Sequence, residues 1–213
     1  MCDSPSDLVW YASYGSNCDA SRFAFYLHGG VREGTAGNHR GARDPSLPRE
    51  SLGMEFPSQI TFAGESRRWG RGVAFLEHRR VSRGTPGALG RRYLITRQQF
   101  EDVFAQENGQ PTSAIEFDNG AESQPYPISK GWYGALVTLE PVDGVPVFTF
   151  TSPEPPETRI SNPPSVEYLR TIATGLSQVH DIDMHRIVER LRNSEVVANA
   201  WSHEDLYSSF SGI

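Results

Sequence analysis

The stretch that decides the fold is LVWYASYGSN, residues 8–17, in which an apolar run ends abruptly in Gly-Ser-Asn. A strand over residues 8–13 must therefore turn sharply, because Gly15 admits backbone angles that other residues avoid and Ser16 and Asn17 favour turns and helix starts. Backbone N–H groups in such a turn, backed by a helix, can hold a carboxylate or a developing oxyanion. The plain alternative is an ordinary strand-turn-helix junction. The candidate binding residues are Tyr14, Gly15, Ser16 and Asn17.

A second motif, Gln106-Glu107, stands at the end of a predicted helix that begins after Thr96. Thr96 followed three residues later by Gln99 is the pattern of a capping box. Asn108 and the glycine after it indicate the helix end. The sequence therefore predicts a helix with well-defined ends.

One carboxylate is expected on the buried face of this helix. Glu107 continues the apolar stripe at i+7, whereas Glu101 and Asp102 are expected to point away. Apolar surroundings and the negative end of the helix dipole would both raise the pKa of Glu107, as a general base that returns its proton requires. The alternative places Glu107 at the edge of the stripe, in water. The stripe consists of Phe100, Val103 and Phe104.

Together these motifs resemble the γ-glutamylcyclotransferase family. The resemblance implies an α+β fold, a mixed α/β arrangement built on a small six- or seven-strand β-barrel with flanking helices. It also implies a substrate cavity roofed by the YGSN-type loop, with the glutamate of the Gln-Glu pair as acid/base. A Gly-, Arg- and Pro-rich insertion at about 30–57 is absent from compact members. The matching segments are YGSN at 14–17, WGRGVAF at 69–75, Gln106-Glu107, PSVEYL at 164–169 and Gly175-Leu176.

The function that this resemblance implies is cleavage of a γ-glutamyl amide by attack of its own α-amine. The reaction releases 5-oxoproline and an amine or amino acid, needs no cofactor, and uses Glu107 to move the proton. One alternative is a hydrolase of a γ-glutamyl or related amide, in which Glu107 activates water. Another is a non-catalytic module that binds a small molecule.

Length and composition favour one domain over residues 1–213, because this length fits one domain better than two. The net charge of −6 argues against nucleic-acid binding. The chain has no apolar run long enough to span a membrane and no signal peptide, so we expect a cytoplasmic protein without membrane contact. Cys2 and Cys18 are expected to be free thiols. A homodimer is compatible with the sequence, which does not fix the oligomeric state.

Other residues and segments are further candidates for a functional role. A metal site at His180 and His185 is disfavoured, because they lie five residues apart and off one helical face. Cys18, near a helix start, could act as a nucleophile or pack as a small apolar residue. The run of arginines at 65–97 is expected either to lie on a solvated rim or to attract an acidic substrate. The insertion at 30–57 is expected to be an irregular lid with arginines facing the substrate, and the alternative is a tolerated surface insertion. Those arginines are Arg32, Arg40, Arg43 and Arg49.

Overall fold

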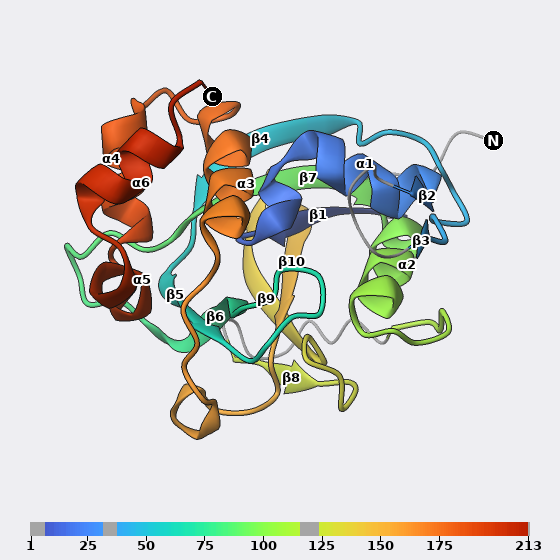
Figure 1. Cartoon of the computed structure of the whole chain (residues 1–213). Coiled ribbons are helices and arrows are strands. Elements are labelled where there is room, and N and C mark those ends of the chain that lie inside the picture. Colours follow the sequence, from blue (N-terminus) through green and yellow to red (C-terminus); the bar gives the residue numbers. More distant parts are fainter. Residues whose placement is uncertain (1–6, 32–37, 116–123, 213) are drawn as a thin grey trace. The chain divides into compact units, whose positions relative to one another are not determined.

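Six strands form one mixed sheet in the computed structural model, which describes residues 7–31, 38–115 and 124–212 (Figure 1). In chain order they are β1 (Leu8–Ser13), β4 (Glu50–Glu55), β7 (Leu89–Thr96), β8 (Tyr126–Pro127), β9 (Ala135–Val142) and β10 (Val145–Thr151). Their order across the sheet is β4-β7-β1-β10-β9-β8. The central strand β1 is parallel to β10, and β10 is antiparallel to β9.

The remaining elements are two short sheets and the helices. The sheets pair β2 with β3 and β5 with β6. The strands are β2 (Gly30–Val31), β3 (Asn38–His39), β5 (Ser58–Ala63) and β6 (Val73–Arg80). The helices are η2 (Ser16–Cys18), α1 (Ala20–His28), α2 (Arg97–Glu107), η3 (Pro156–Thr158), α3 (Val166–Ser177), α4 (Met184–Leu191), α5 (Glu195–Ala200) and α6 (His203–Ser209).

The predicted α+β class is confirmed, but the predicted barrel is wrong. The sheet is open, with β4 and β8 at its edges, and β5 and β6 pair with each other in a separate sheet. The apolar pattern of a strand indicates which face is buried but not which strand is its hydrogen-bonding partner. The sequence pattern therefore cannot show whether the sheet closes into a barrel.

Strands β9 and β10 form an antiparallel hairpin. Asp143 and Gly144 link the strands with φ of 50° and 76°. Positive φ at both central residues is the geometry of the two-residue turn that matches the twist of a hairpin, and Asp-Gly suits it.

The chain divides into two compact units, each assembled from three separate segments. The first unit comprises residues 1–12, 21–51 and 92–153, and the second comprises 13–20, 52–91 and 154–213. The first holds most of the large sheet together with α2 and nearly all of α1. The second holds η2, the β5–β6 pair and helices α3 to α6. The single-domain organisation stays a prediction.

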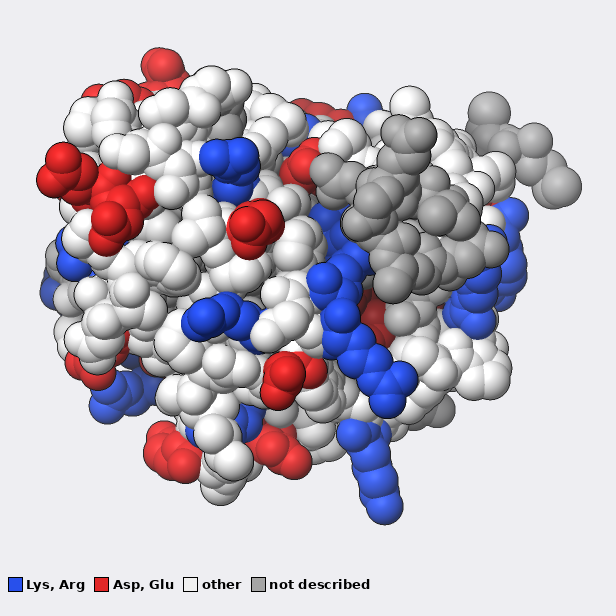
Figure 2. Space-filling model, in the orientation of Figure 1, with Lys and Arg blue, Asp and Glu red and all other residues white. Residues whose placement is uncertain are grey.

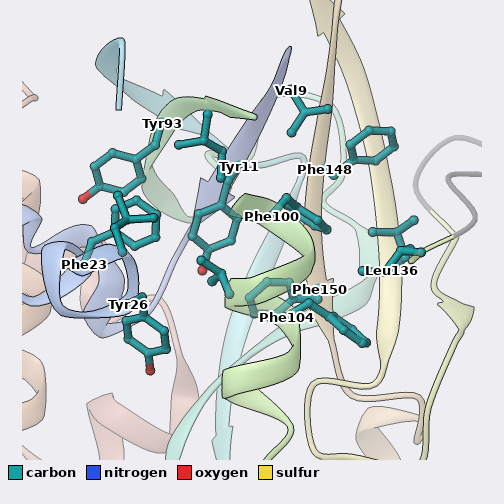
Figure 3. Packing of buried hydrophobic residues seen from close by; sticks show 14 residues of the cluster. Val9, Tyr11, Phe23, Tyr26, Tyr93, Phe100, Phe104, Leu136, Phe148 and Phe150 are labelled. Atoms are coloured by element: carbon teal, nitrogen blue, oxygen red, sulfur yellow. The ribbon is translucent and has the colours of Figure 1, made fainter. Parts of the chain in front are cut away.

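Aromatic side chains make the core of the first unit (Figure 3). Phe100 and Phe104 project from α2, and the Phe104 ring meets Phe150 of β10 edge-on at 5.8 Å. Tyr11 of β1 stacks on Phe150 at 5.2 Å. Edge-on and offset-stacked rings add to the gain from burying their area. The cluster consists of Val9, Tyr11, Phe23, Tyr26, Leu27, Tyr93, Ile95, Phe100, Val103, Phe104, Ile115, Leu136, Phe148 and Phe150.

Helix α3 organises the second unit by packing against η2, α4 and α6. Its first turn is capped by Ser165, whose Oγ accepts a hydrogen bond from the N–H of Tyr168 at 3.2 Å. Such a cap satisfies one of the four unpaired N–H groups at a helix start. Tyr168, Leu169 and Ile172 then lie on the buried face. Helix α3 therefore begins at a local capping residue and buries one face.

Candidate functional site

The turn Tyr14–Asn17 lies in the second unit and leads from β1 into the 3₁₀ helix η2. Ser16 and Asn17 are buried, and the ring of Tyr14 meets Phe56 edge-on at 5.6 Å. The N–H of Cys18 donates to the Gly15 carbonyl at 3.0 Å, and the N–H of Asp19 donates to the Ser16 carbonyl at 3.2 Å. Both amides therefore hold the turn itself, and neither is assigned to a ligand.

Gly15 is required for space and not for its backbone angles, which corrects the expectation from sequence. Its φ of −106° and ψ of −151° are extended values open to other residues. A Cβ at Gly15 would stand 3.0 Å from the hydroxyl of Tyr168. That hydroxyl also accepts a hydrogen bond from the N–H of Ala74 at 3.2 Å, so it cannot withdraw without leaving a buried donor unpaired.

Two further contacts fix the end of the turn. Arg91, buried in the second unit, donates from Nη1 to the Cys18 carbonyl at 3.1 Å and to Oε1 of Gln178 at 2.5 Å. Gly175 of α3 lies so close that a Cβ there would stand 2.0 Å from the carbonyl carbon of Cys18. The turn is therefore rigid, as a preorganised binding loop requires.

Cys18 packs as a small apolar residue and is not suited to act as a nucleophile. Its side chain is fully buried, and Sγ donates to the Ser13 carbonyl at 3.2 Å. Burial raises the pKa of the thiol to about 12, so the reactive thiolate is scarce at neutral pH. Cys18 is a free thiol, as predicted, and Cys2 lies outside the described residues.

Glu107 is the last residue of α2, in the first unit, and its two neighbours fasten the backbone around it. Gln106 donates from Nε2 to the Tyr26 carbonyl of α1 at 2.8 Å. Asn108 donates from Nδ2 to the Tyr133 carbonyl at 3.2 Å and accepts from the Tyr133 N–H at 3.1 Å. Glu107 is thus held between two amide side chains, and its own side chain is half-buried.

The fully buried carboxylate of α2 is Asp102 and not Glu107, so the expectation that Asp102 points away is wrong. Its side chain is 1% exposed. Asp102 accepts from the Arg43 N–H at 2.8 Å, from Arg43 Nε at 3.0 Å and from the Thr112 hydroxyl at 2.8 Å. A charged partner 59 residues earlier in the chain makes this burial possible, and the helical stripe gives no sign of it. The predicted capping box of Thr96 and Gln99 is present.

The insertion at 30–57 contains structured segments and is therefore not irregular throughout, whereas its role as a lid stays a prediction. Residues 50–55 form the edge strand β4, and Gly41 accepts a weak hydrogen bond from Gln106 at 3.4 Å. Arg43 pairs with Glu101 and Asp102 of α2, and Arg40 donates to the Thr112 hydroxyl at 2.6 Å. Arg32 lies outside the described residues.

The arginines at 65–97 do not share one role. Arg91 is buried, as described above, and the guanidinium of Arg92 lies 4.9 Å from the ring centroid of Trp10. Basic and acidic side chains both occur on the face drawn in Figure 2. These arginines therefore do not form a uniform solvated rim, because two of them serve packing.

The histidines considered for a metal site have other contacts. Nε2 of His180 lies 2.8 Å from the Gly90 carbonyl, and the ring of His185 stacks on Tyr207 at 3.7 Å. Within the described ranges, no three His, Cys, Asp or Glu side chains are placed to share a metal ion. No helix in that part of the chain has the length and apolarity to cross a membrane.

Comparison with known structures identifies the fold. A solved γ-glutamyl cyclotransferase superposes with a TM-score of 0.54 over 94% of this chain and 98% of its own, at 14% identity. The chain has the cyclotransferase-like fold. An uncharacterised human protein of known structure is similar with a TM-score of 0.51 at 14% identity, covering 87% of each chain. No protein-family profile matches the sequence.

One curated protein is related in sequence. It is histone deacetylase 5 of Arabidopsis thaliana, 33% identical over 187 residues. The match takes in 79% of this chain but only 28% of the plant protein. The chain thus spans less than a third of that relative, whose name describes a much longer protein.

Sequence reasoning missed two residues of these regions. Asn108 was expected only as a helix stop, and its hydrogen bonds to Tyr133 depend on a loop 25 residues away. Arg159 stands out by no sequence motif, but its guanidinium is buried. Neither carries a local signal, because both contacts are made by tertiary structure.

Proposed function

We propose that this chain is a γ-glutamylcyclotransferase-like enzyme that cleaves a γ-glutamyl amide and releases 5-oxoproline. The observation that supports it most is the fold, shared with a γ-glutamyl cyclotransferase over nearly the whole of both chains. The YGSN turn and the Gln-Glu pair, on which the sequence resemblance rests, are both held rigidly within their own units.

In the proposed reaction the substrate supplies its own nucleophile. The α-amino nitrogen attacks the γ-carbonyl carbon, the new C–N bond closes a five-membered lactam, and the old amide C–N bond breaks. Glu107 takes a proton from the α-ammonium group and returns it to the departing amine, so no other reactant is consumed. Well-oriented intramolecular reactions reach effective molarities of about 10⁵ M or more, so the protein needs mainly to fold the substrate and move protons.

The turn is proposed to hold the anionic end of the substrate. Its buried Ser16 and Asn17 side chains supply polar groups in a rigid setting. Because the Cys18 and Asp19 amides hold the turn, we assign ligand contacts to the residues before them.

Product analysis tests the proposal. The protein is incubated with γ-glutamyl amino acids, γ-glutamyl amines and glutathione, and products are identified by mass spectrometry. Cyclisation releases 5-oxoproline, whereas hydrolysis would release free glutamate. The proposal is refuted if none of these compounds releases 5-oxoproline. Ligand binding without any product would favour the non-catalytic module.

Substitution of Glu107 tests its role. Glu107→Gln keeps the size of the side chain but removes the proton acceptor, so kcat should fall by about 10²-fold or more while the fold survives. The matched control is Glu140→Gln, which changes an exposed carboxylate of the same unit and should leave kcat unaltered. Full activity in a folded Glu107→Gln protein would remove Glu107 from the mechanism.

A further inference from the structure

Arg159 places its charged group where arginine rarely does. All three guanidinium nitrogens, Nε, Nη1 and Nη2, are buried and have no hydrogen-bond partner among the described residues. The residue as a whole is only half-buried. Arginine usually does the reverse and covers apolar surface with its stem while its guanidinium stays in water. The burial is therefore specific to the part of the side chain that can bind an anion.

The surroundings of Arg159 hold the cation but leave its donors unused. Its Cζ lies 4.9 Å from the ring centroid of Phe75 on β6, which is a cation–π contact. None of the three guanidinium nitrogens forms a hydrogen bond alongside this contact within the described part of the chain. Buried donors without partners are costly, and a charged group more so.

Burial dominates the electrostatics of the Arg159 guanidinium and disfavours its charged form. Burial lowers the pKa of the Arg159 guanidinium, and Tyr14 opposes that change, followed by Glu77, Glu154 and Glu157. Arg159 nevertheless belongs to none of the ion pairs formed within the described part of the chain.

The backbone on both sides of Arg159 is fixed. Before it, η3 ends with the Arg159 N–H donating to the Pro156 carbonyl at 3.2 Å. After it, Ser161 forms a β-bridge with Ala63, and Asn162 donates from Nδ2 to the Gly64 carbonyl at 2.6 Å. A residue anchored in this way presents its side chain in one place, as a binding residue should.

We propose that Arg159 is an anion receptor of the second unit, whose buried guanidinium takes the carboxylate of a small molecule. The planar fork of a guanidinium matches a carboxylate with two parallel hydrogen bonds, which would satisfy the donors that the fold leaves unpaired. The choice of a carboxylate rests on the proposed function, because γ-glutamyl compounds and 5-oxoproline both carry one. Arg159 is linked to the turn through β6, because it contacts Phe75 and the Cβ of the preceding Ala74 lies 3.9 Å from a Cβ built at Gly15.

Binding measurements test this receptor without relying on turnover. Titration calorimetry compares 5-oxoproline with pyrrolidin-2-one, the same ring without its carboxylate. The parent protein should bind 5-oxoproline at least about tenfold more tightly, as the loss of a charge-assisted hydrogen bond predicts. Arg159→Met should bind both compounds equally weakly. Arg159→Lys keeps the positive charge but lacks the planar guanidinium, so its affinity for 5-oxoproline should lie between those of the parent and Arg159→Met. Arg186→Met, which removes an exposed arginine of the same unit, should bind as the parent does.

Thermal unfolding without ligand provides a second measurement. Because Arg159→Met removes an unsatisfied buried charge, it should melt no lower than the parent, and 5-oxoproline should raise the Tm of the parent alone. A lower Tm for ligand-free Arg159→Met would show that the guanidinium already serves the fold, and would overturn the proposal. Undiminished 5-oxoproline binding by Arg159→Met would also overturn it, as would Arg159-dependent binding of inorganic phosphate but not of 5-oxoproline.

The outcomes separate this inference from the proposed function. Release of 5-oxoproline by the parent, with unchanged KM and 5-oxoproline affinity in Arg159→Met, refutes the receptor and leaves the enzyme. Arg159-dependent 5-oxoproline binding by a protein that turns over none of the γ-glutamyl compounds refutes the enzyme and leaves the receptor.

Discussion

Asp102→Asn should destabilise the protein without impairing the chemistry assigned to its helix. Asp102 is buried and accepts charge-assisted hydrogen bonds from Arg43 and a further one from Thr112. Losing one partner of a buried ion pair costs about 3–5 kcal/mol. Because the Arg43 side chain is 48% exposed and can be rehydrated, we expect the lower part of that range or less, about 2–3 kcal/mol.

Urea denaturation followed by circular dichroism measures this loss. The midpoint should fall with an unchanged m-value, and for a chain of this size the Tm should fall by about 4–12 °C. At a temperature where both proteins are folded, turnover of Asp102→Asn should match the parent. Glu107→Gln should show the opposite pattern, with stability kept and turnover lost.

A double-substitution cycle identifies the source of the loss. If Asp102 acts through Arg43, the effects of Asp102→Asn and Arg43→Met will not be additive, with a coupling free energy of about 1 kcal/mol or more. A change in unfolding free energy below about 0.5 kcal/mol for Asp102→Asn would refute the reasoning, because a buried carboxylate with these partners cannot be so inconsequential.

Three further substitutions test the turn and the end of α2. Gly15→Val should displace the Tyr168 hydroxyl and abolish ligand binding and turnover, as measured by calorimetry and 5-oxoproline release, and an active Gly15→Val protein would contradict the close approach. Cys18→Ala should keep turnover within a few-fold of the parent. In the parent protein the Cys18 thiol, with a pKa of about 12, should resist alkylation at pH 8 until urea exposes it. Rapid alkylation of the native protein would show a reactive thiolate. Asn108→Ala removes three hydrogen bonds and should lower the unfolding free energy by about 2–3 kcal/mol in urea titrations. Its kcat should also fall, because these hydrogen bonds fix the backbone next to Glu107. Unaltered stability and kcat would show that Asn108 does not hold Glu107 in place.

Local structure was the part of the fold that the sequence could predict. Thr96 and Gln99 lie three residues apart and bond to each other, so the start of α2 is encoded within one turn. Asp143 and Gly144 likewise specify their hairpin turn, because the residue types carry the required backbone angles. Such features need no knowledge of distant segments.

Contacts between distant segments were the part that could not be predicted. The helical stripe predicts that Asp102 faces solvent, because the stripe carries no sign of Arg43, on which the burial of Asp102 depends. The local motif predicts unusual backbone angles at Gly15, because the Tyr168 hydroxyl that needs the space belongs to the distant helix α3. The candidate residues themselves follow from local motifs, whereas the groups that hold them in place come from elsewhere in the fold.

The space at Gly15 has a consequence for how this sequence can evolve. A side chain at position 15 and the hydroxyl at position 168 compete for the same volume. Among homologues we therefore expect coupled variation, with larger residues at 15 found together with residues at 168 that lack the hydroxyl, such as phenylalanine. A lineage that keeps the tyrosine should keep the glycine, so the C-terminal helix α3 restricts the mutations that the turn near the N-terminus can accept.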